Sequence, residues 1–245
     1  MLWGSGISGL ALEAPPCCPT PPMNNDARES IFAQHAQRHP LADATRRLID
    51  EIRSTEAPDA VLKETLSAVE KAIALLAPHR GQGGFAQALL ADGAAAFESE
   101  SDPMVFFANS PFIGRGNPLA LPVEFSVRDG VVHGRGIFTG PYCGPPNFVH
   151  GGVIAGVFDE LLGTVNVVHE QGAMTGTLTV RYRQPTPLFE EIRMEGHQAG
   201  VDGRKVFAEG TMWHGDTLLA EAEGIFIRLP DEVRNQIFGN GQGLG

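Results

Sequence analysis

The spacing of apolar residues divides the chain into a helical N-terminal part and a C-terminal part made of strands. Between residues 26 and 80, apolar side chains such as Leu62, Leu66 and Ile73 recur at three- and four-residue intervals, the period of an amphipathic helix. We expect two or three helices there. A glycine-rich break and a later proline bound the segment 81–103, which we interpret as a linker containing a short Ala-rich helix.

Beyond the linker the period changes to the alternation typical of β-strands. Two alternating runs flank Asp129-Gly130, a dipeptide that favours a tight hairpin turn. One helical stretch follows, from Gly151 to about Val168, and one helix among antiparallel strands predicts an α+β architecture. No internal repeat is visible. The four strands expected after the helix span about 173–183, 190–199, 204–213 and 217–228, with turns at Asp202-Gly203 and Gly215-Asp216 between the last three.

The start of that helix carries candidate chemistry. His150, Gly151 and Gly152 lead directly into the helical pattern. The first N–H groups of a helix have no intrahelical partner and lie at the positive end of the helix dipole, and glycine lets another group approach them closely. This is the geometry of an oxyanion-binding site.

An acidic residue lies two turns further along the same helix. The helical period places Asp159 on a stripe of small residues with Gly152, Gly156 and Gly163, so that a slender acyl thioester could reach it. The opposite stripe is apolar and should pack on the sheet. A carboxylate on a mostly buried helix is costly without a partner, and enzymes use such positions for general-base or nucleophilic chemistry. We expect the adjacent Glu160 to be solvated.

These residues resemble a known family, the hotdog-fold acyl-CoA thioesterases of the phenylacetyl-CoA thioesterase type, including the branch with the mitochondrial long-chain enzymes. The resemblance spans positions near 110 to 230. It implies a hotdog fold, an antiparallel sheet wrapped around one long helix, within residues 104–230, and residues 26–80 are a helical extension to it. The matching elements are His150-Gly151-Gly152, Asp159, Gly163, Met174-Thr175, the segment 180–188, Asp202-Gly203-Arg204-Lys205 and the segment 219–227.

The resemblance also implies roles for individual residues. The backbone N–H of Gly152, assisted by Gly151, would polarise the thioester carbonyl while Asp159 activates water or attacks directly. His150 would hydrogen-bond near the thioester, and Thr175 would assist at the carboxylate. In this family the site forms between subunits, so the chain is expected to act as a homodimer or tetramer, on an acyl-CoA substrate and without a cofactor.

Other polar residues are candidate contacts to the substrate. Arg204 and Lys205 match a place where relatives hold the coenzyme A phosphates, and Asn147 precedes the helix start. Arg181 is a further candidate cation. Strand alternation would place Arg181 on the same face as Thr175.

Composition and charge narrow the classes of function. A net charge of −11 argues against wholesale nucleic-acid binding, and no apolar run approaches the roughly 18 residues of a membrane span. Three cysteines without zinc-type spacing lend no support to a metal site and favour a reducing, cytoplasmic setting. We expect residues 1–25 to be a disordered leader and 231–245 a flexible tail.

Three functions are compatible with the sequence: acyl-CoA hydrolysis, hydration or dehydration of acyl thioesters on a hotdog fold, and acyl-CoA sensing without turnover. The combination of His150-Gly151-Gly152 with Asp159 favours hydrolysis. The acyl group, the choice between a covalent and a general-base mechanism, and the role of residues 26–80 stay open.

Overall fold

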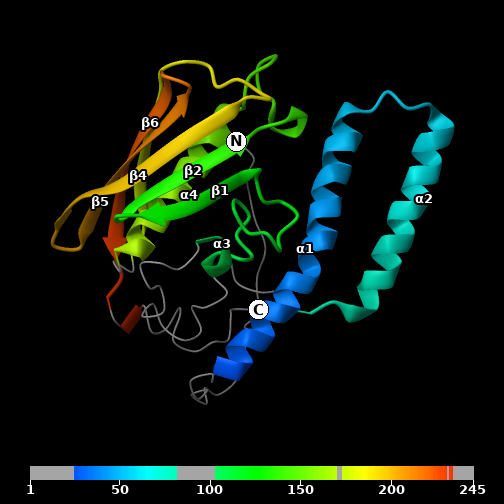
Figure 1. Ribbon diagram of the computed structural model, residues 1–245, viewed down its shortest axis with the longest axis horizontal. Coiled ribbons are helices and arrows are strands. Elements are labelled where there is room, and N and C mark those ends of the chain that lie inside the picture. The colour runs from blue at the N-terminus through cyan, green and yellow to red at the C-terminus, as the bar shows by residue number, and fades with distance from the viewer. Residues whose placement is uncertain (1–24, 82–102, 170–172, 231, 234–245) are drawn as a thin grey trace, which may run out of the picture.

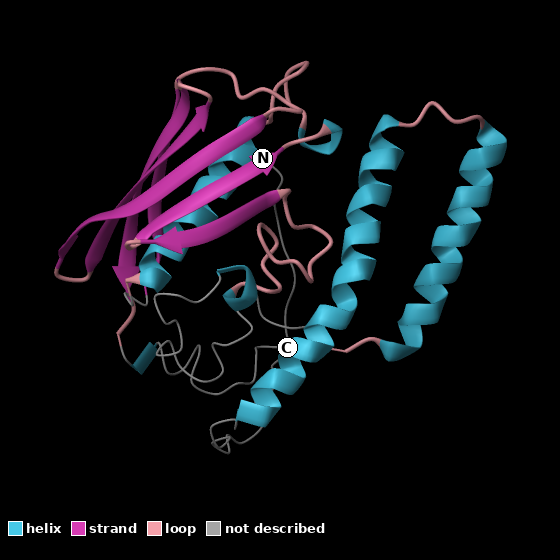
Figure 2. Ribbon diagram, viewed as in Figure 1, coloured by secondary structure: helices cyan, strands magenta, loops and turns pink. Residues whose placement is uncertain are grey.

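The computed structural model describes residues 25–81, 103–169, 173–230 and 232–233 (Figures 1 and 2). Residues 1–24 of the predicted leader, almost all of the linker and nearly all of the tail lie outside these residues. The elements are α1 (Asn25–Ser54), α2 (Asp59–Leu76), a 3-10 turn η1 (Ala77–His79), α3 (Pro103–Phe106), β1 (Val123–Arg128), β2 (Val131–Ile137), a 3-10 turn η4 (Gly140–Tyr142), α4 (Gly151–Val168), β3 (Ala173–Tyr182), β4 (Glu191–Asp202), β5 (Lys205–His214) and β6 (Thr217–Arg228).

The six strands form one antiparallel sheet in the order β1-β2-β4-β5-β6-β3. All three predicted turns are confirmed. Asp129 and Gly130 both have positive φ, 52° and 74°, as a type I′ turn requires, and Gly203 and Gly215 provide the positive φ that closes the next two hairpins. Strand β4 extends to Asp202, beyond the predicted end, through a β-bulge between Gln198 and Gly200.

Helix α4 lies across the face of the sheet and has the predicted bounds (Figure 1). On its apolar stripe, Val157, Leu161 and Val165 are fully buried against the strands. Glycines on the sheet allow this close approach, because a Cβ at Gly196 would lie 3.0 Å from the Leu161 Cγ atom. The architecture is therefore the predicted hotdog, a curved antiparallel sheet around one long helix.

The length and hydropathy of α4 would by themselves allow it to cross a membrane. A core helix has the same properties, since it too must be apolar along most of its length. Eight residues of α4 are buried within the chain. The sheet that covers them is sufficient to explain this hydropathy.

The N-terminal segment forms two helices, as predicted. Helix α1 packs against the sheet domain, where the Arg46 guanidinium donates to the carbonyl oxygens of Asn117 at 2.6 Å and Arg115 at 3.3 Å. Helix α2 follows a four-residue connection and lies on the far side of α1 from the sheet (Figure 1). No residue of α2 is buried.

Candidate active site

The Asp159 carboxylate is held against the edge of the sheet. The Thr175 hydroxyl on β3 donates a hydrogen bond to the Asp159 Oδ1 atom at 2.9 Å. A Cβ added at Gly163, one turn further along α4, would meet nothing within 4 Å. A partly buried carboxylate thus borders open space at an edge strand.

A β-bulge in β3 turns Thr175 toward α4. Thr175 pairs with Phe226 while Thr177 pairs with Ile225, so Gly176 is the extra residue. Because neighbouring residues on β6 point to opposite faces, Thr175 lies on the helix side, the face of the buried Phe226. The prediction that Thr175 shares a face with Arg181 was therefore wrong, since strict alternation does not continue through a bulge.

The helix start has one N–H group engaged and one free. The Gly152 N–H donates to the His150 Nδ1 atom at 2.9 Å, so His150 is the N-cap of α4. No residue in the described part of the chain accepts from the Gly151 N–H. The Tyr182 hydroxyl donates to the Gly151 carbonyl at 2.8 Å and ties this end of α4 to β3. The role foreseen for Gly152 stays a prediction, and its engaged N–H makes Gly151 the better donor.

Within one chain, the free N–H of Gly151 and the carboxylate of Asp159 are far apart. Eight residues separate Gly151 from Asp159, and a helix rises about 1.5 Å per residue, so the two lie roughly 12 Å apart along the axis. Because a hydrogen bond joins heavy atoms only about 3 Å apart, one small group cannot contact both the Gly151 N–H and the Asp159 carboxylate of the same chain.

The stripe of small residues around Asp159 is only partly open. A Cβ at Gly156 would lie 2.4 Å from the Phe112 ring, so the aromatic side chain covers that position. Phe112 belongs to the segment 107–122, which connects α3 to β1. Open space beside Asp159 remains at Gly163, where an added Cβ would meet nothing within 4 Å.

Glu160 is partly buried, contrary to our expectation that it would be solvated. The buried Ser110 hydroxyl donates to the Glu160 Oε1 atom at 2.5 Å, because the segment that carries Ser110 packs over this face of α4. Burial raises the pKa of the Glu160 carboxyl above its ordinary value of 4.5; the bond from Ser110 opposes this shift and the negative charge of Asp159 adds to it.

Replacing Glu160 by glutamine is expected to stabilise the protein at neutral pH. A raised pKa in the folded state means that the native state binds more protons than the unfolded state, so stability falls as pH rises from 4.5 toward the folded-state pKa. Glutamine removes this penalty and can still accept the bond from Ser110. One kcal/mol shifts Tm by roughly 2–4 °C at this chain length, so we expect a rise of a few degrees at pH 7.

Calorimetry across pH would test this expectation. The gain in Tm of Glu160→Gln over wild type should shrink toward zero below pH 4.5, where the wild-type carboxyl is protonated in both states. Glu64→Gln, on the exposed surface of α2, is the matched control and should leave Tm unchanged. A gain that does not depend on pH would contradict the burial of a charged carboxyl.

The predicted cations Arg181 and Lys205 lie on the exposed face of the sheet, opposite the helix side that carries Thr175. Arg181 makes a 2.6 Å ion pair with Glu223 on the exposed face of the sheet. Lys205 on β5 pairs with Ile227 on β6, and Ile227 pairs on its other side with Met174 on β3. Lys205 is therefore two strand spacings, about 10 Å, from Met174. Arg204, whose Nε atom donates to a backbone carbonyl of β6, adjoins Lys205 on the same turn.

Asn147 lies at the surface of the loop before α4. Its φ of 69° is the left-handed conformation that asparagine tolerates, and its carbonyl accepts from the Leu188 N–H at 3.1 Å. The structure therefore gives Asn147 a clear backbone role, and contact with a substrate stays a prediction.

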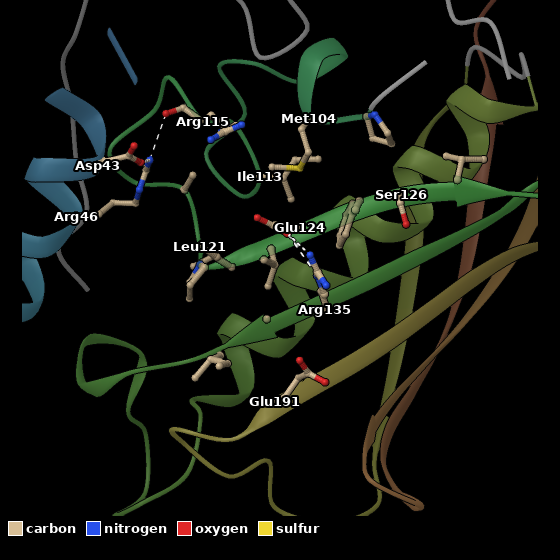
Figure 3. Close-up of a pocket in the computed structure, with 18 residues that line it drawn as sticks. Asp43, Arg46, Met104, Ile113, Arg115, Leu121, Glu124, Ser126, Arg135 and Glu191 are labelled. Carbon is tan, nitrogen blue, oxygen red and sulfur yellow. Dashed lines mark hydrogen bonds and ion pairs between the residues drawn. The ribbon is translucent and has the colours of Figure 1, made fainter. Parts of the chain in front are cut away.

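A groove of about 780 Å³ lies elsewhere, between α1, the segment before β1, and strands β1 and β2 (Figure 3). Met104, Ile113 and Leu121 supply apolar lining, and Glu124 pairs with Arg135 across the strands at 3.0 Å. None of the predicted site residues lines it. The groove is at the β1 edge, whereas Asp159 and Thr175 are at the β3 end of the strand order.

Sequence reasoning missed four residues that shape the site: Tyr182, Ser110, Phe112 and the bulged Gly176. An isolated glycine inside a strand pattern is a recognised bulge signal, so Gly176 could have been found. The other three act through contacts with residues far along the chain, which no local pattern encodes. Within the described ranges, no group of three His, Cys, Asp or Glu side chains is placed to hold a metal ion.

Comparison with known proteins identifies similar chains. The acyl-coenzyme A thioesterase THEM4 of Mus musculus is 38% identical over 91 residues, 36% of this chain and 39% of that protein. The protein of the same name from Xenopus laevis is 41% identical over 93 residues, 37% of this chain and 42% of that protein. The chain thus spans about two fifths of the length of these curated relatives. No protein-family model matches it.

One solved structure is similar over most of the chain. It is described as a thioesterase superfamily protein, is 30% identical, and superimposes with a TM-score of 0.66. The match covers 78% of this chain and 94% of that one. Residues 103–230 make up only roughly half of this chain, so the match also extends beyond the sheet domain.

Proposed function

The chain belongs to the thioesterase superfamily, and from that premise we propose that it hydrolyses acyl-coenzyme A thioesters to a free acid and coenzyme A. The observation that carries the proposal is the Asp159 carboxylate, held by the Thr175 hydroxyl beside the open space at Gly163. Two relatives named acyl-coenzyme A thioesterase support the choice of substrate.

The chemistry requires a base and an oxyanion donor. Asp159 takes a proton from water as the water oxygen attacks the thioester carbonyl carbon, and the carbonyl oxygen becomes an oxyanion. The Gly151 N–H at the positive start of α4 stabilises that oxyanion. The carbon–sulfur bond then breaks, and the departing thiolate recovers the proton from Asp159. Direct attack by the carboxylate is the covalent variant of the same scheme.

The active form in this proposal is a homodimer joined at β3. Along the ten residues of β3, the only strand pairing among the described residues is to β6, so its other edge offers unpaired backbone groups. Adding the same strand of a second chain would extend the sheet and bring a second α4 alongside the first. The 12 Å between Gly151 and Asp159 within a chain would be bridged by the helix start of the partner.

Arg204 and Lys205 are proposed to bind the coenzyme A phosphates. Lys205 lies about 10 Å from the start of β3 on the exposed face of the sheet, so the thioester arm would pass the end of these strands to reach the helix side. The chain carries a net charge of −11, so a polyanionic ligand needs such a local cationic patch.

A panel of acyl-CoA substrates, from short to long and aryl acyl groups, tests the proposed activity. Release of free coenzyme A, followed with a thiol reagent, is expected for at least one class. Tight binding without thiol release across the panel would instead indicate a sensor. Addition of water to an enoyl-CoA without thiol release would indicate a hydratase.

Mixing two inactive variants tests the shared site. We expect Asp159→Asn and Gly151→Pro, co-expressed in equal amounts, to recover about a quarter of wild-type activity, because half of the dimers are mixed and each holds one intact site of two. Each variant alone supplies the control. If both groups acted within one chain, no combination would regain activity.

A further inference from the structure

The exposed side of α2 has the pattern of a coiled-coil seam. Leu62, Leu66, Val69, Ile73 and Leu76 follow one another at alternating four- and three-residue intervals, the heptad spacing that brings two helices together. Leu66 is 58% exposed, Ile73 59% and Leu76 54%. An 18-residue helix with a regular apolar stripe and no buried residue is unusual, because helices of this length gain most of their stability from packing that stripe.

We propose that α2 pairs with α2 of a second copy of this chain, in antiparallel orientation. The charged residues that flank the apolar seam indicate that the partner helix is a second copy of α2. Lys63 and Glu70 occupy equivalent heptad positions on the same flank, one heptad apart, and both side chains are exposed. Neither has an ion-pair partner among the described residues.

Orientation follows from these two charges. Antiparallel helices place equivalent flanking positions opposite each other, so Lys63 of each copy meets Glu70 of the other when Leu66 faces Val69. A parallel pair would set Glu70 against the uncharged Thr65 and gain no ion pair. The antiparallel pair also aligns the helix dipoles favourably.

Register follows from the same pair of charges. Sliding the antiparallel helices by one heptad, so that Val69 faces Ile73, brings Glu70 of one copy close to Glu70 of the other. Like charges disfavour that arrangement. The register with Leu66 opposite Val69 has four apolar layers and two symmetric ion pairs, one between each Lys63 and the other copy's Glu70.

This contact is separate from the proposed β3 dimer. Helix α2 lies beyond α1 (Figure 1), and α1 packs near the segment that leads into β1, at the opposite end of the strand order from β3. A chain that uses both surfaces therefore assembles beyond a dimer. A chain that uses only α2 forms a dimer.

Sedimentation of the full chain tests the α2 contact. Leu66→Asp is expected to reduce the mass of the assembly at least two-fold, whatever the state of the β3 edge. Ser67→Asp adds the same charge one position away, off the seam, and should leave the mass unchanged. Coenzyme A release by Leu66→Asp should equal that of wild type, so a failure of the proposed activity would be seen separately. Equal masses for wild type and Leu66→Asp would overturn the proposal.

A charge exchange tests orientation and register, with variants that leave the apolar seam intact. Lys63→Glu and Glu70→Lys, each alone, place like charges across the pair and should weaken association roughly ten-fold. The double variant restores opposite charges and should return to within about two-fold of wild type. A double variant as weak as either single one would overturn the antiparallel arrangement.

Discussion

Replacing Asp159 by asparagine is expected to lower kcat for acyl-CoA hydrolysis by roughly 10²- to 10⁴-fold, the contribution typical of a positioned base. Asparagine has nearly the same shape, and its Oδ1 atom can still accept the bond from Thr175, so the protein should fold normally. What is lost is the basic oxygen. Steady-state kinetics with the best substrate of the panel, together with a melting curve, would measure both effects.

Glu160→Gln is the matched control for this substitution. It neutralises the next carboxylate on the same helix, which Ser110 holds on a different face from Thr175. We expect its turnover to stay within a few-fold of wild type. Near-normal turnover in Asp159→Asn would falsify the assigned role and require a different base.

Single turnover in water enriched in ¹⁸O distinguishes the two mechanisms of Asp159. A covalent anhydride that water opens at the carboxylate carbon leaves solvent oxygen in the side chain. A general base sends solvent oxygen only to the product acid. Mass spectrometry of the peptide that contains Asp159 would show whether its side chain has gained ¹⁸O.

Replacing Gly151 by proline is expected to lower kcat roughly 10²- to 10³-fold, the usual cost of losing one oxyanion donor. Proline has no N–H, so the substitution removes the one group that the proposal assigns to the oxyanion. It is otherwise well suited to the first position of a helix. The preceding His150 has φ −63° and ψ 132°, an extended conformation that a following proline permits.

Gly151→Ala separates the loss of the N–H from the added bulk. A Cβ at this position would lie 3.5 Å from the Tyr182 ring, an ordinary contact, so both variants place a carbon there without a clash. Alanine keeps the N–H and should retain most of the activity. Equal losses in the two variants would point to steric exclusion of the substrate and not to a lost donor.

Much of the fold could be predicted from local pattern. Helix α4 has the bounds that its periodicity indicated, and each turn closes at a predicted dipeptide. Such features depend on residues within a few positions of one another. Glycine at Gly130, Gly203 and Gly215, for example, permits the positive φ that its own turn requires.

The candidate site was only partly predictable. The sequence identified Asp159 and Thr175, and the structure joins them by a hydrogen bond. The burial of Glu160 was missed because it depends on Ser110, which is 50 residues away. The periodicity of apolar residues in a helix or strand does not show which distant segment of the chain will pack against it.

The sequence by itself determined the order of the elements, their turns and the presence of an acidic residue on a glycine-lined helix, because each follows from the conformational preferences of neighbouring residues. Only the tertiary structure decided which groups face one another. The bulge at Gly176 turned Thr175 toward Asp159, and the N-cap at His150 engaged the Gly152 N–H and left the Gly151 N–H free. The length of α4 between them separated Asp159 from Gly151 within a single chain. These outcomes depend on packing between distant segments, where burial and contact geometry outweigh local propensity.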